Sequence, residues 1–353
     1  MLSRVNKLEA ALAQTDCDAV LVTNLKNIYY LTSFSGTEAT VFISKNRRIF
    51  LTDSRYTLIA KGVIKGFDII ETRDALSEIA KIIADDKIKT IGFDDEISYH
   101  SFKTLEELFS DYKLTAMTAF IENLRMIKDE GEIATIRKAC QISDQAFLDV
   151  LDFIKPGQTT ELQVMNFLDA RMRQLGASGA SFDFIIASGY RSAMPHGVAS
   201  EKVIQTGETL TMDFGCYYNH YVSDMTRTIH VGHVTDEERE IYDIVLRSNQ
   251  ALIEAAKAGM SRIEFDQVPR KVINDTGYGQ YFTHGIGHGI GLDIHEIPYF
   301  GKSSEPIEAG MVLTDEPGIY LDGKYGVRIE DDILITDTGC ELLTLAPKEL
   351  IVI

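Results

Sequence analysis

Apolar residues recur alternately at helical and at strand spacing along the first third of the chain. Val5, Leu8 and Leu12 lie on one side of a short segment and predict an amphipathic helix. The apolar run at 18–24 predicts a buried strand. Continued alternation predicts an α/β domain with a mixed sheet over residues 1–122. The other predicted strands are 40–44, 48–52, 67–71 and 90–93, and the predicted helices are 3–13, 54–65, 76–84 and 101–111.

The pattern changes at Lys128, where a long amphipathic helix begins. Its apolar stripe includes Ile136 and Phe147, and the helix is stopped by Pro156 and Gly157. Strands then dominate, interrupted by helices, which predicts an α+β second domain. This domain covers 128–353, with further helices at 160–175, 236–257 and 261–275 and strands at 184–187, 209–214, 220–231, 311–316 and 327–336.

Composition narrows the class of protein. Lys and Arg number 35 against 53 Asp and Glu, a net charge of −18. Such an acidic surface repels phosphate backbones and anionic lipid, so we expect neither nucleic acid nor a membrane as partner. The four cysteines are far apart and form no CxxC pair, which argues against a disulfide framework or a structural zinc site. The N-terminal segment lacks a signal-peptide core and no apolar run reaches bilayer length, so we expect a cytoplasmic protein.

Two aspartates lie within apolar strand patterns, where an unpaired carboxylate is costly. Asp213 follows Leu210-Thr211-Met212, and Asp224 comes eleven residues later. Asn219 lies between them and is suited to turn a hairpin that brings the two aspartates face to face. Carboxylates placed in this way share a proton or a cation. The pattern alone equally allows one turn residue and one salt-bridge partner.

A stretch rich in histidine and glycine covers 284–296. It holds His284, His288 and His295, with four glycines among residues 285–291. Because glycine makes a helix costly, the segment reads as a tight loop or strand whose backbone approaches something closely. A dinucleotide-binding motif fits poorly, because no strand–turn–helix unit surrounds it and the third glycine is misplaced. Three histidines in so short a glycine-rich stretch indicate a site.

Two glutamates complete the candidate set. Glu316 ends an apolar strand and precedes a Pro-Gly turn. Glu330 lies in a stretch whose period-2 alternation puts Arg328, Glu330 and Asp332 on one face. The alternative for Glu330 is an ion pair with Arg328 on a solvated face.

Taken together, these residues resemble the proline-specific branch of the pita-bread metallopeptidases, which contains Xaa-Pro aminopeptidases (aminopeptidase P), prolidases and creatinase. The resemblance covers the whole chain and implies an α+β pita-bread catalytic domain preceded by a smaller α/β domain like that of creatinase. It implies two divalent ions, both bridged by Asp224 and Glu330, with His288 as the single imidazole ligand. The implied ligand set is complete here, unlike in metal-free relatives, and consists of Asp213, Asp224, His288, Glu316 and Glu330.

Five residues are expected to take part in catalysis. A hydroxide shared by the two ions attacks the scissile carbonyl, and Glu316 accepts or relays its proton. His295 helps to hold the developing oxyanion. His196 and His284 contact the substrate near the proline. Arg328 orients a ligand or binds substrate.

Oxygen-rich ligation with one imidazole favours Mn²⁺, with Co²⁺, Fe²⁺ or Zn²⁺ as alternatives. We expect an Xaa-Pro aminopeptidase. Proline lacks a backbone N–H and has a fixed φ, so it is accepted by a site that needs neither an N–H contact nor free rotation of the substrate. The alternative within the same chemistry is a prolidase restricted to Xaa-Pro dipeptides. A non-catalytic pita-bread binding protein is a third interpretation. The resemblance also implies a homodimer.

Overall fold

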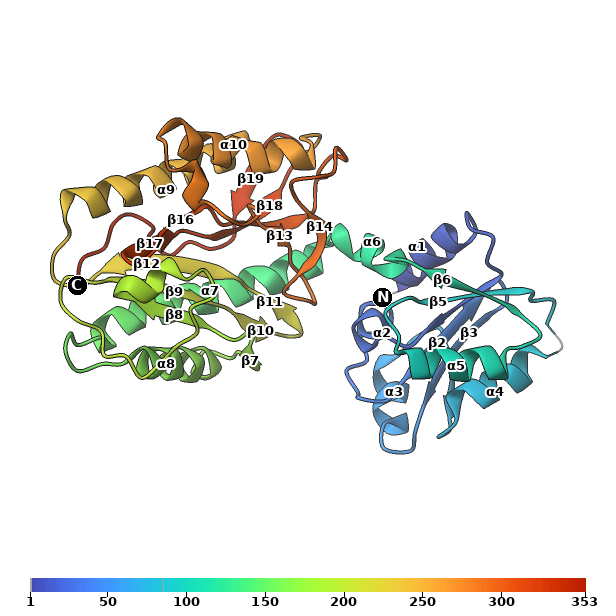
Figure 1. Ribbon diagram of the computed structural model, residues 1–353. Coiled ribbons are helices and arrows are strands. Elements are labelled where there is room, and N and C mark those ends of the chain that lie inside the picture. The colour runs from blue at the N-terminus through green and yellow to red at the C-terminus, as the bar shows by residue number, and fades with distance from the viewer. Residues whose placement is uncertain (1, 85) are drawn as a thin grey trace. The chain divides into compact units, whose positions relative to one another are not determined.

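The computed structural model describes residues 2–84 and 86–353. The chain divides into two compact units, Met1–Arg125 and Met126–Ile353 (Figure 1). An apolar core lies in the first unit, and the two halves of the second unit have separate cores. In the described part of the chain, no helix combines the length and the apolar character that crossing a bilayer requires.

The first unit is a six-stranded sheet flanked by helices. Its strands are β1 (Ala19–Val22), β2 (Thr40–Ser44), β3 (Arg47–Thr52), β4 (Asp68–Glu71), β5 (Thr90–Asp94) and β6 (Lys113–Met117), and its helices are α1 (Leu2–Leu12), α2 (Leu25–Thr32), α3 (Thr57–Val63), α4 (Ala75–Ile83), α5 (Tyr99–Leu108) and α6 (Phe120–Met126). The strand order is β4-β3-β2-β1-β5-β6. Only β2 runs antiparallel to its neighbours. The mixed sheet confirms the α/β class predicted for this part.

Three elements of the first unit were not predicted, namely α2, β6 and α6. α2 follows β1 directly because the Asn24 side chain accepts hydrogen bonds from the N–H groups of Lys26 and Asn27 and so caps the helix. α3 begins three residues later than predicted. The cause is a turn in which the Asp53 carboxylate accepts from the backbone N–H and the guanidinium of Arg55.

The first half of the second unit packs α7 and α8 against antiparallel strands. The bounds are α7 (Glu130–Phe153), α8 (Glu161–Gln174), β7 (Gly179–Ala180), β8 (Ile185–Ser188), η1 (Gly189–Ala193), β9 (Thr209–Phe214), β10 (Cys216–Tyr218), β11 (Tyr221–Val222) and β12 (Met225–His230). β9 lies between β8 and β12. The core of this half includes Phe147, Leu168, Met212 and Ile229, all fully buried.

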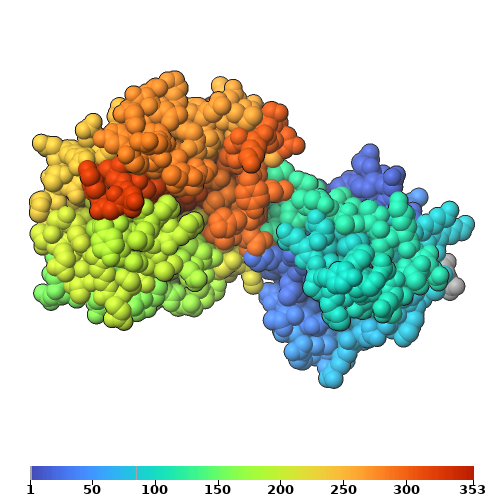
Figure 2. Space-filling view, in the orientation of Figure 1, coloured from blue at the N-terminus to red at the C-terminus, as the bar shows by residue number. Residues whose placement is uncertain are grey.

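The second half repeats this plan with α9 and α10. The bounds are α9 (Asp236–Ala255), α10 (Arg262–Asp275), η2 (Gly279–Tyr281), β13 (His288–Gly289), β14 (Glu296–Tyr299), β15 (Val312–Asp315), β16 (Gly318–Leu321), β17 (Tyr325–Arg328), β18 (Asp331–Ile335) and β19 (Cys340–Leu342). β15 and β18 pair at the centre of the larger sheet, and β16 and β17 form a separate hairpin. Figures 1 and 2 show the yellow-green segments of the first half side by side with the orange and red segments of the second.

The four long helices of the second unit begin where local sequence predicts. Each has a capping box, in which the N-cap side chain accepts from the N3 backbone N–H and the N3 side chain accepts from the N-cap N–H. These reciprocal bonds satisfy two backbone donors that a helix otherwise leaves unpaired. The four pairs are Asp129 with Glu132, Thr160 with Gln163, Thr235 with Glu238, and Ser261 with Glu264.

Two long strands predicted from the sequence are broken in the structure. The stretch predicted at 220–231 divides at Asp224 into β11 and β12, and that predicted at 327–336 divides at Glu330 into β17 and β18. The chain changes sheets at each break, since β17 pairs with β16 whereas β18 pairs with β15. The continuous strand alternation predicted for Arg328, Glu330 and Asp332 is therefore interrupted at Glu330.

Candidate metal centre

Strands of the first half position both aspartates. Asp213 lies near the end of β9, opposite Thr226 of β12. Asp224 immediately precedes β12, and its backbone N–H donates to the Asp332 carboxylate at 2.9 Å. The hairpin between β10 and β11 turns at Asn219 and its neighbour, both of which have positive φ. This confirms the turn predicted at Asn219.

The glycine-rich stretch is a loop that contains the two-residue strand β13, which pairs with β15. The backbone N–H of His288 donates to the Thr314 hydroxyl at 3.0 Å. Gly287 is pressed so closely onto this strand that a Cβ would lie 2.3 Å from the Thr314 carbonyl oxygen. The predicted close backbone approach is therefore confirmed, and it fixes the residue next to His288.

Gly287→Ala is accordingly expected to lower the free energy of unfolding by about 2–3 kcal/mol, because the new methyl group forces the loop away from β15. Gly285→Ala is the matched control, because a Cβ there meets no atom within 4 Å. Thermal unfolding of both variants checks this expectation. Equal melting temperatures for the two would contradict it.

The end of the loop is held by a buried carboxylate. Glu296 accepts from the N–H groups of Leu292 and Asp293 at 2.8 and 3.0 Å. Its other oxygen lies 3.3 Å from the ammonium of Lys128, and both side chains are buried. These bonds fold the chain back just before β14 and thereby fix the position of His295.

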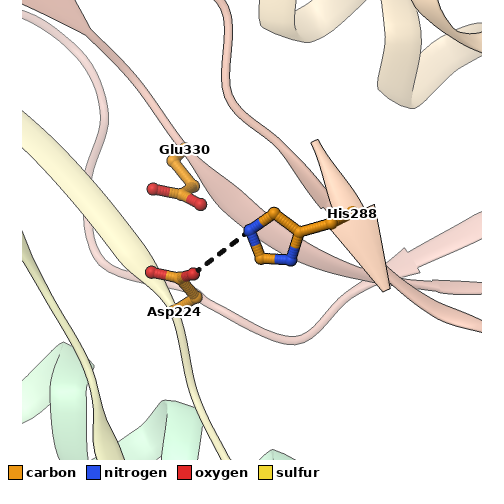
Figure 3. Close-up of side chains that lie close together, drawn as sticks. All are labelled: Asp224, His288 and Glu330. Atoms are coloured by element: carbon orange, nitrogen blue, oxygen red, sulfur yellow. Dashed lines mark ion pairs between the residues drawn. The ribbon is translucent and has the colours of Figure 1, made fainter. Parts of the chain in front are cut away.

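All nine predicted site residues line one cavity of about 450 Å³ in the second unit. Figure 3 shows three of them, Asp224, His288 and Glu330, converging from different segments of the chain. A nitrogen or oxygen atom from each of these three lies within 4.8 Å of the others. The nine predicted residues in this lining are His196, Asp213, Asp224, His284, His288, His295, Glu316, Arg328 and Glu330.

The His288 ring presents a lone pair to two carboxylates. Its Nδ1 lies 3.1 Å from the carbonyl oxygen of Gly289, so we assign the proton to Nδ1 and leave Nε2 as an acceptor. Nε2 lies 3.8 Å from Asp224 Oδ2 and 3.7 Å from Glu316 Oε1. Three electron-rich atoms that face one another must share a proton or a cation, and ligands about 2.1 Å from a shared ion are separated by such distances.

The carboxylates raise one another's pKa. Burial, with Glu330 and Asp213 nearby, raises the pKa of Asp224 well above its usual range. Burial, with Glu316 and Asp213 nearby, does the same to the pKa of Glu330. Burial raises the pKa of Glu316 to about 8, although Arg328 opposes the rise. Asp213 Oδ1 is buried and has no hydrogen-bond partner within residues 2–84 and 86–353. This donor set therefore fits divalent cations, which would neutralise the clustered charge.

Arg328 anchors one side of the cavity. Its guanidinium donates to Asp213 Oδ2 at 2.6 Å, to the Thr226 hydroxyl at 3.0 Å and to the Tyr320 hydroxyl at 2.8 Å. Thr226 in turn donates to Glu330 Oε2 at 2.6 Å. The solvated-face alternative for Glu330 is wrong, since Glu330 and Arg328 are both buried. The sequence analysis did not single out Thr226 or Tyr320. The available signal was that each is a polar residue within an otherwise apolar strand.

The three other histidines differ in their surroundings. His284 is held through both ring nitrogens, with Nδ1 at 2.8 Å from Gly285 O and Nε2 at 2.8 Å from the Tyr320 hydroxyl. Burial lowers its pKa to about 4, so the ring is neutral at physiological pH. The His295 ring centroid lies 4.4 Å from that of His288. Burial lowers the pKa of His295, and His196, which lies nearby, adds to this shift.

In the α+β second unit, four carboxylates, three of them buried, lie around one imidazole, an arrangement that defines a metal-dependent hydrolase of the pita-bread class. The chain belongs to metallopeptidase family M24, whose model matches residues 134–337. Residues 4–127 match the Creatinase/Prolidase N-terminal domain. Both matches confirm the predicted fold class and resemblance. Membership of this family implies divalent metal ions.

Individual relatives match over their full length. The chain is 44% identical to a structure described as Xaa-Pro dipeptidase from Bacillus anthracis, with a TM-score of 0.97 and coverage of 100% of this chain and 99% of that one. It is 39% identical to an X-Pro aminopeptidase from Thermotoga maritima, with a TM-score of 0.91 and coverage of 98% and 100%. An Xaa-Pro dipeptidase of Pyrococcus furiosus is 38% identical over 99% of this chain and 100% of the relative.

Proposed function

We propose that this protein is an Xaa-Pro dipeptidase that hydrolyses the bond between an N-terminal residue and a C-terminal proline. The single observation that carries its metal-dependent chemistry is the His288 lone pair facing Asp224 and Glu316 in the cavity. The dipeptidase names of relatives at 44% and 38% identity support the substrate class. They favour the dipeptidase over the aminopeptidase that we expected from sequence alone.

The proposed ligand set is the one expected from sequence. Bound divalent ions lower the pKa of a water molecule and polarise the scissile carbonyl. Four carboxylates and one imidazole, without a thiolate, favour Mn²⁺ over softer ions. The proposed ligands are Asp213, Asp224, His288, Glu316 and Glu330.

The protein's own groups direct the reaction. Glu316 takes up the proton of the attacking water on a carboxylate oxygen and returns it to the proline nitrogen, as the new C–O bond forms and the C–N bond breaks. His295 donates to the oxygen on which negative charge develops. Arg328 keeps Asp213 in place through its 2.6 Å bond, and His284, held by Tyr320, forms a fixed wall.

The cavity wall suits a proline ring. Phe182, Ile185, Val198, Ile294 and Tyr299 give it an apolar side. An apolar surface needs no N–H contact from the substrate, and the proline amide nitrogen has no hydrogen to offer.

We propose that a histidine side chain binds the carboxylate of the substrate proline. Arg328 already donates to Asp213, Tyr320, Thr226 and the Pro195 carbonyl, so most of its guanidinium N–H groups are occupied within the protein. His196 and His295 also line the cavity. Because His295 is assigned to the developing oxyanion, we assign the dipeptide carboxylate to His196.

An Xaa-Pro aminopeptidase is the second candidate, favoured by the 39% identity to the Thermotoga maritima enzyme. The deciding experiment compares Ala-Pro, Ala-Pro-amide and Ala-Pro-Ala as substrates of the Mn²⁺-loaded protein. A dipeptidase is expected to prefer Ala-Pro over the uncharged amide by about 100-fold, since an unpaired recognition site costs about 3 kcal/mol. Faster cleavage of the tripeptide would establish the aminopeptidase instead. No cleavage of any of the three would overturn both. The homodimer and the cytoplasmic location stay predictions.

A further inference from the structure

A second buried polar cluster lies directly behind the proposed ligands. Asp315 and Asp331 are direct cross-strand neighbours in β15 and β18, and both are fully buried. Like charges directly opposite in an antiparallel pair destabilise it. Asp315 immediately precedes Glu316, and Asp331 immediately follows Glu330, so the cluster and the cavity share two stretches of backbone.

One asparagine and one lysine join the two aspartates. Asn249 of α9 donates from Nδ2 to Asp315 and to Asp331, at 3.1 Å in each case. The Lys348 ammonium donates to Asp331 Oδ2 at 2.6 Å and to Asn249 Oδ1 at 2.7 Å. The Lys348 backbone carbonyl accepts from the Tyr242 hydroxyl at 2.9 Å. A segment near the end of the chain is therefore bonded directly to β18, which follows Glu330, and through Asn249 to β15, which precedes Glu316.

Arg227 completes the cluster from the first half of the unit. Its guanidinium makes five hydrogen bonds, one for each N–H, and the residue is 1% exposed. Two of them go to the backbone carbonyl of Glu330 at 2.6 Å and to Asp331 Oδ1 at 2.7 Å. Arg227 thus fixes the Glu330 backbone, whereas Lys348 and Asn249 fix the spacing of Asp331 from Asp315.

We infer that Lys348 is a positioning residue for the metal centre: by joining Asp331 to Asn249 it sets the separation of the Glu316 and Glu330 carboxylates. This inference rests on the proposed ligand set. Residues behind the ligands of a metal site commonly change metal affinity by 10- to 100-fold when they are replaced. The lysine touches neither the cavity nor the substrate, so its effect passes through the two strands.

Whether removal of Lys348 weakens or tightens Mn²⁺ binding distinguishes a positioning role from a purely electrostatic one. Lys348 carries a positive charge near a site for cations. If charge alone mattered, its removal would tighten Mn²⁺ binding, because like charges repel. If Lys348 sets the carboxylate separation, its removal weakens Mn²⁺ binding, because Glu316 and Glu330 no longer hold a fixed distance.

The test measures Mn²⁺ affinity of the chelator-stripped full chain by titration calorimetry. Lys348→Met is expected to weaken binding about tenfold, and Lys348→Arg to restore most of the affinity. Lys348→Gln is a second neutral variant that retains a hydrogen-bond donor and carries the test if the Met variant folds poorly by circular dichroism. Lys202→Met is the matched control, since Lys202 forms an equally short 2.6 Å ion pair with Glu208 and is 20% exposed against 16% for Lys348.

The outcomes distinguish the two proposals. Wild-type protein that binds no Mn²⁺, Co²⁺, Fe²⁺ or Zn²⁺ would overturn the proposed function and this inference with it. Wild-type binding with unchanged or tighter binding by Lys348→Met overturns the inference alone. Equal weakening by Lys202→Met also overturns it, because the effect would then reflect general loss of stability. Weakening confined to Lys348→Met and Lys348→Gln, with recovery in Lys348→Arg, supports it.

Discussion

Asp224→Asn is expected to abolish both metal binding and peptide hydrolysis. Asp224 lies at the centre of the site. Its Oδ2 is 3.8 Å from His288 Nε2, and one of its carboxylate oxygens lies within 4.8 Å of a carboxylate oxygen of Glu330. The substitution keeps the size of the side chain but replaces a charged oxygen by an amide nitrogen, which cannot bind a cation. We expect turnover to fall by at least about 10³-fold, equivalent to about 4 kcal/mol of transition-state stabilisation.

The measurements are steady-state hydrolysis of Ala-Pro at saturating Mn²⁺ and metal content after dialysis. Asp94→Asn is the control, an isosteric change in the first unit at an aspartate that accepts from the N–H groups of Thr23 and Asn24. It is expected to retain the metal and the activity. Substantial turnover by Asp224→Asn at saturating metal would remove Asp224 from the ligand set.

Removal of metal is expected to destabilise the protein, and increasingly so as the pH rises. In the metal-free site the pKa of Glu316 is about 8, against 4.5 for an ordinary glutamate, because burial disfavours its ionised form. The folded state therefore holds a proton that the unfolded chain releases. Stability linked to this proton is present below about pH 4.5 and is lost as the pH rises through about 8. Asp224 and Glu330 shift in the same direction.

Bound cations remove this penalty because they compensate the ionised carboxylates. Saturating Mn²⁺ is expected to raise the melting temperature of stripped protein by about 5 °C or more near pH 8, and by less near pH 6. Differential scanning calorimetry across this range measures the gain. A gain that shrinks with rising pH would show that the clustered carboxylates do not carry the effect. Mg²⁺ at equal concentration is a useful comparison, because it loses its hydration water reluctantly.

Apolar periodicity predicted most of the helices and strands. α7 to α10 begin within two residues of their predicted starts, and β9 has the bounds that its apolar run predicts. These features are local, so the sequence contains them directly. α2 was missed because its eight residues directly follow a buried strand, and the apolar run there reads as one element.

The strand breaks at Asp224 and Glu330 were not predictable from local pattern. Period-2 alternation identifies extended chain but does not indicate when the chain leaves one sheet for another. The candidate residues were found because unusual chemistry lay within apolar segments. Residues such as Lys348 and Asn249 were not found, because their partners are distant in sequence. For Asn249, a polar side chain on the buried face of α9 was the available signal.

The division of the second unit into two separately cored halves bears on how it assembles. Asp213 and Asp224 belong to the first half, whereas His288, Glu316 and Glu330 belong to the second. Neither half alone contains the complete proposed ligand set. A cation bound by this set would act as a reversible cross-link between residues 64 to 117 positions apart in the chain, which would lower the entropy of any state in which the halves separate. A backbone cut between β12 and α9 would therefore leave two fragments whose reassociation depends on metal concentration.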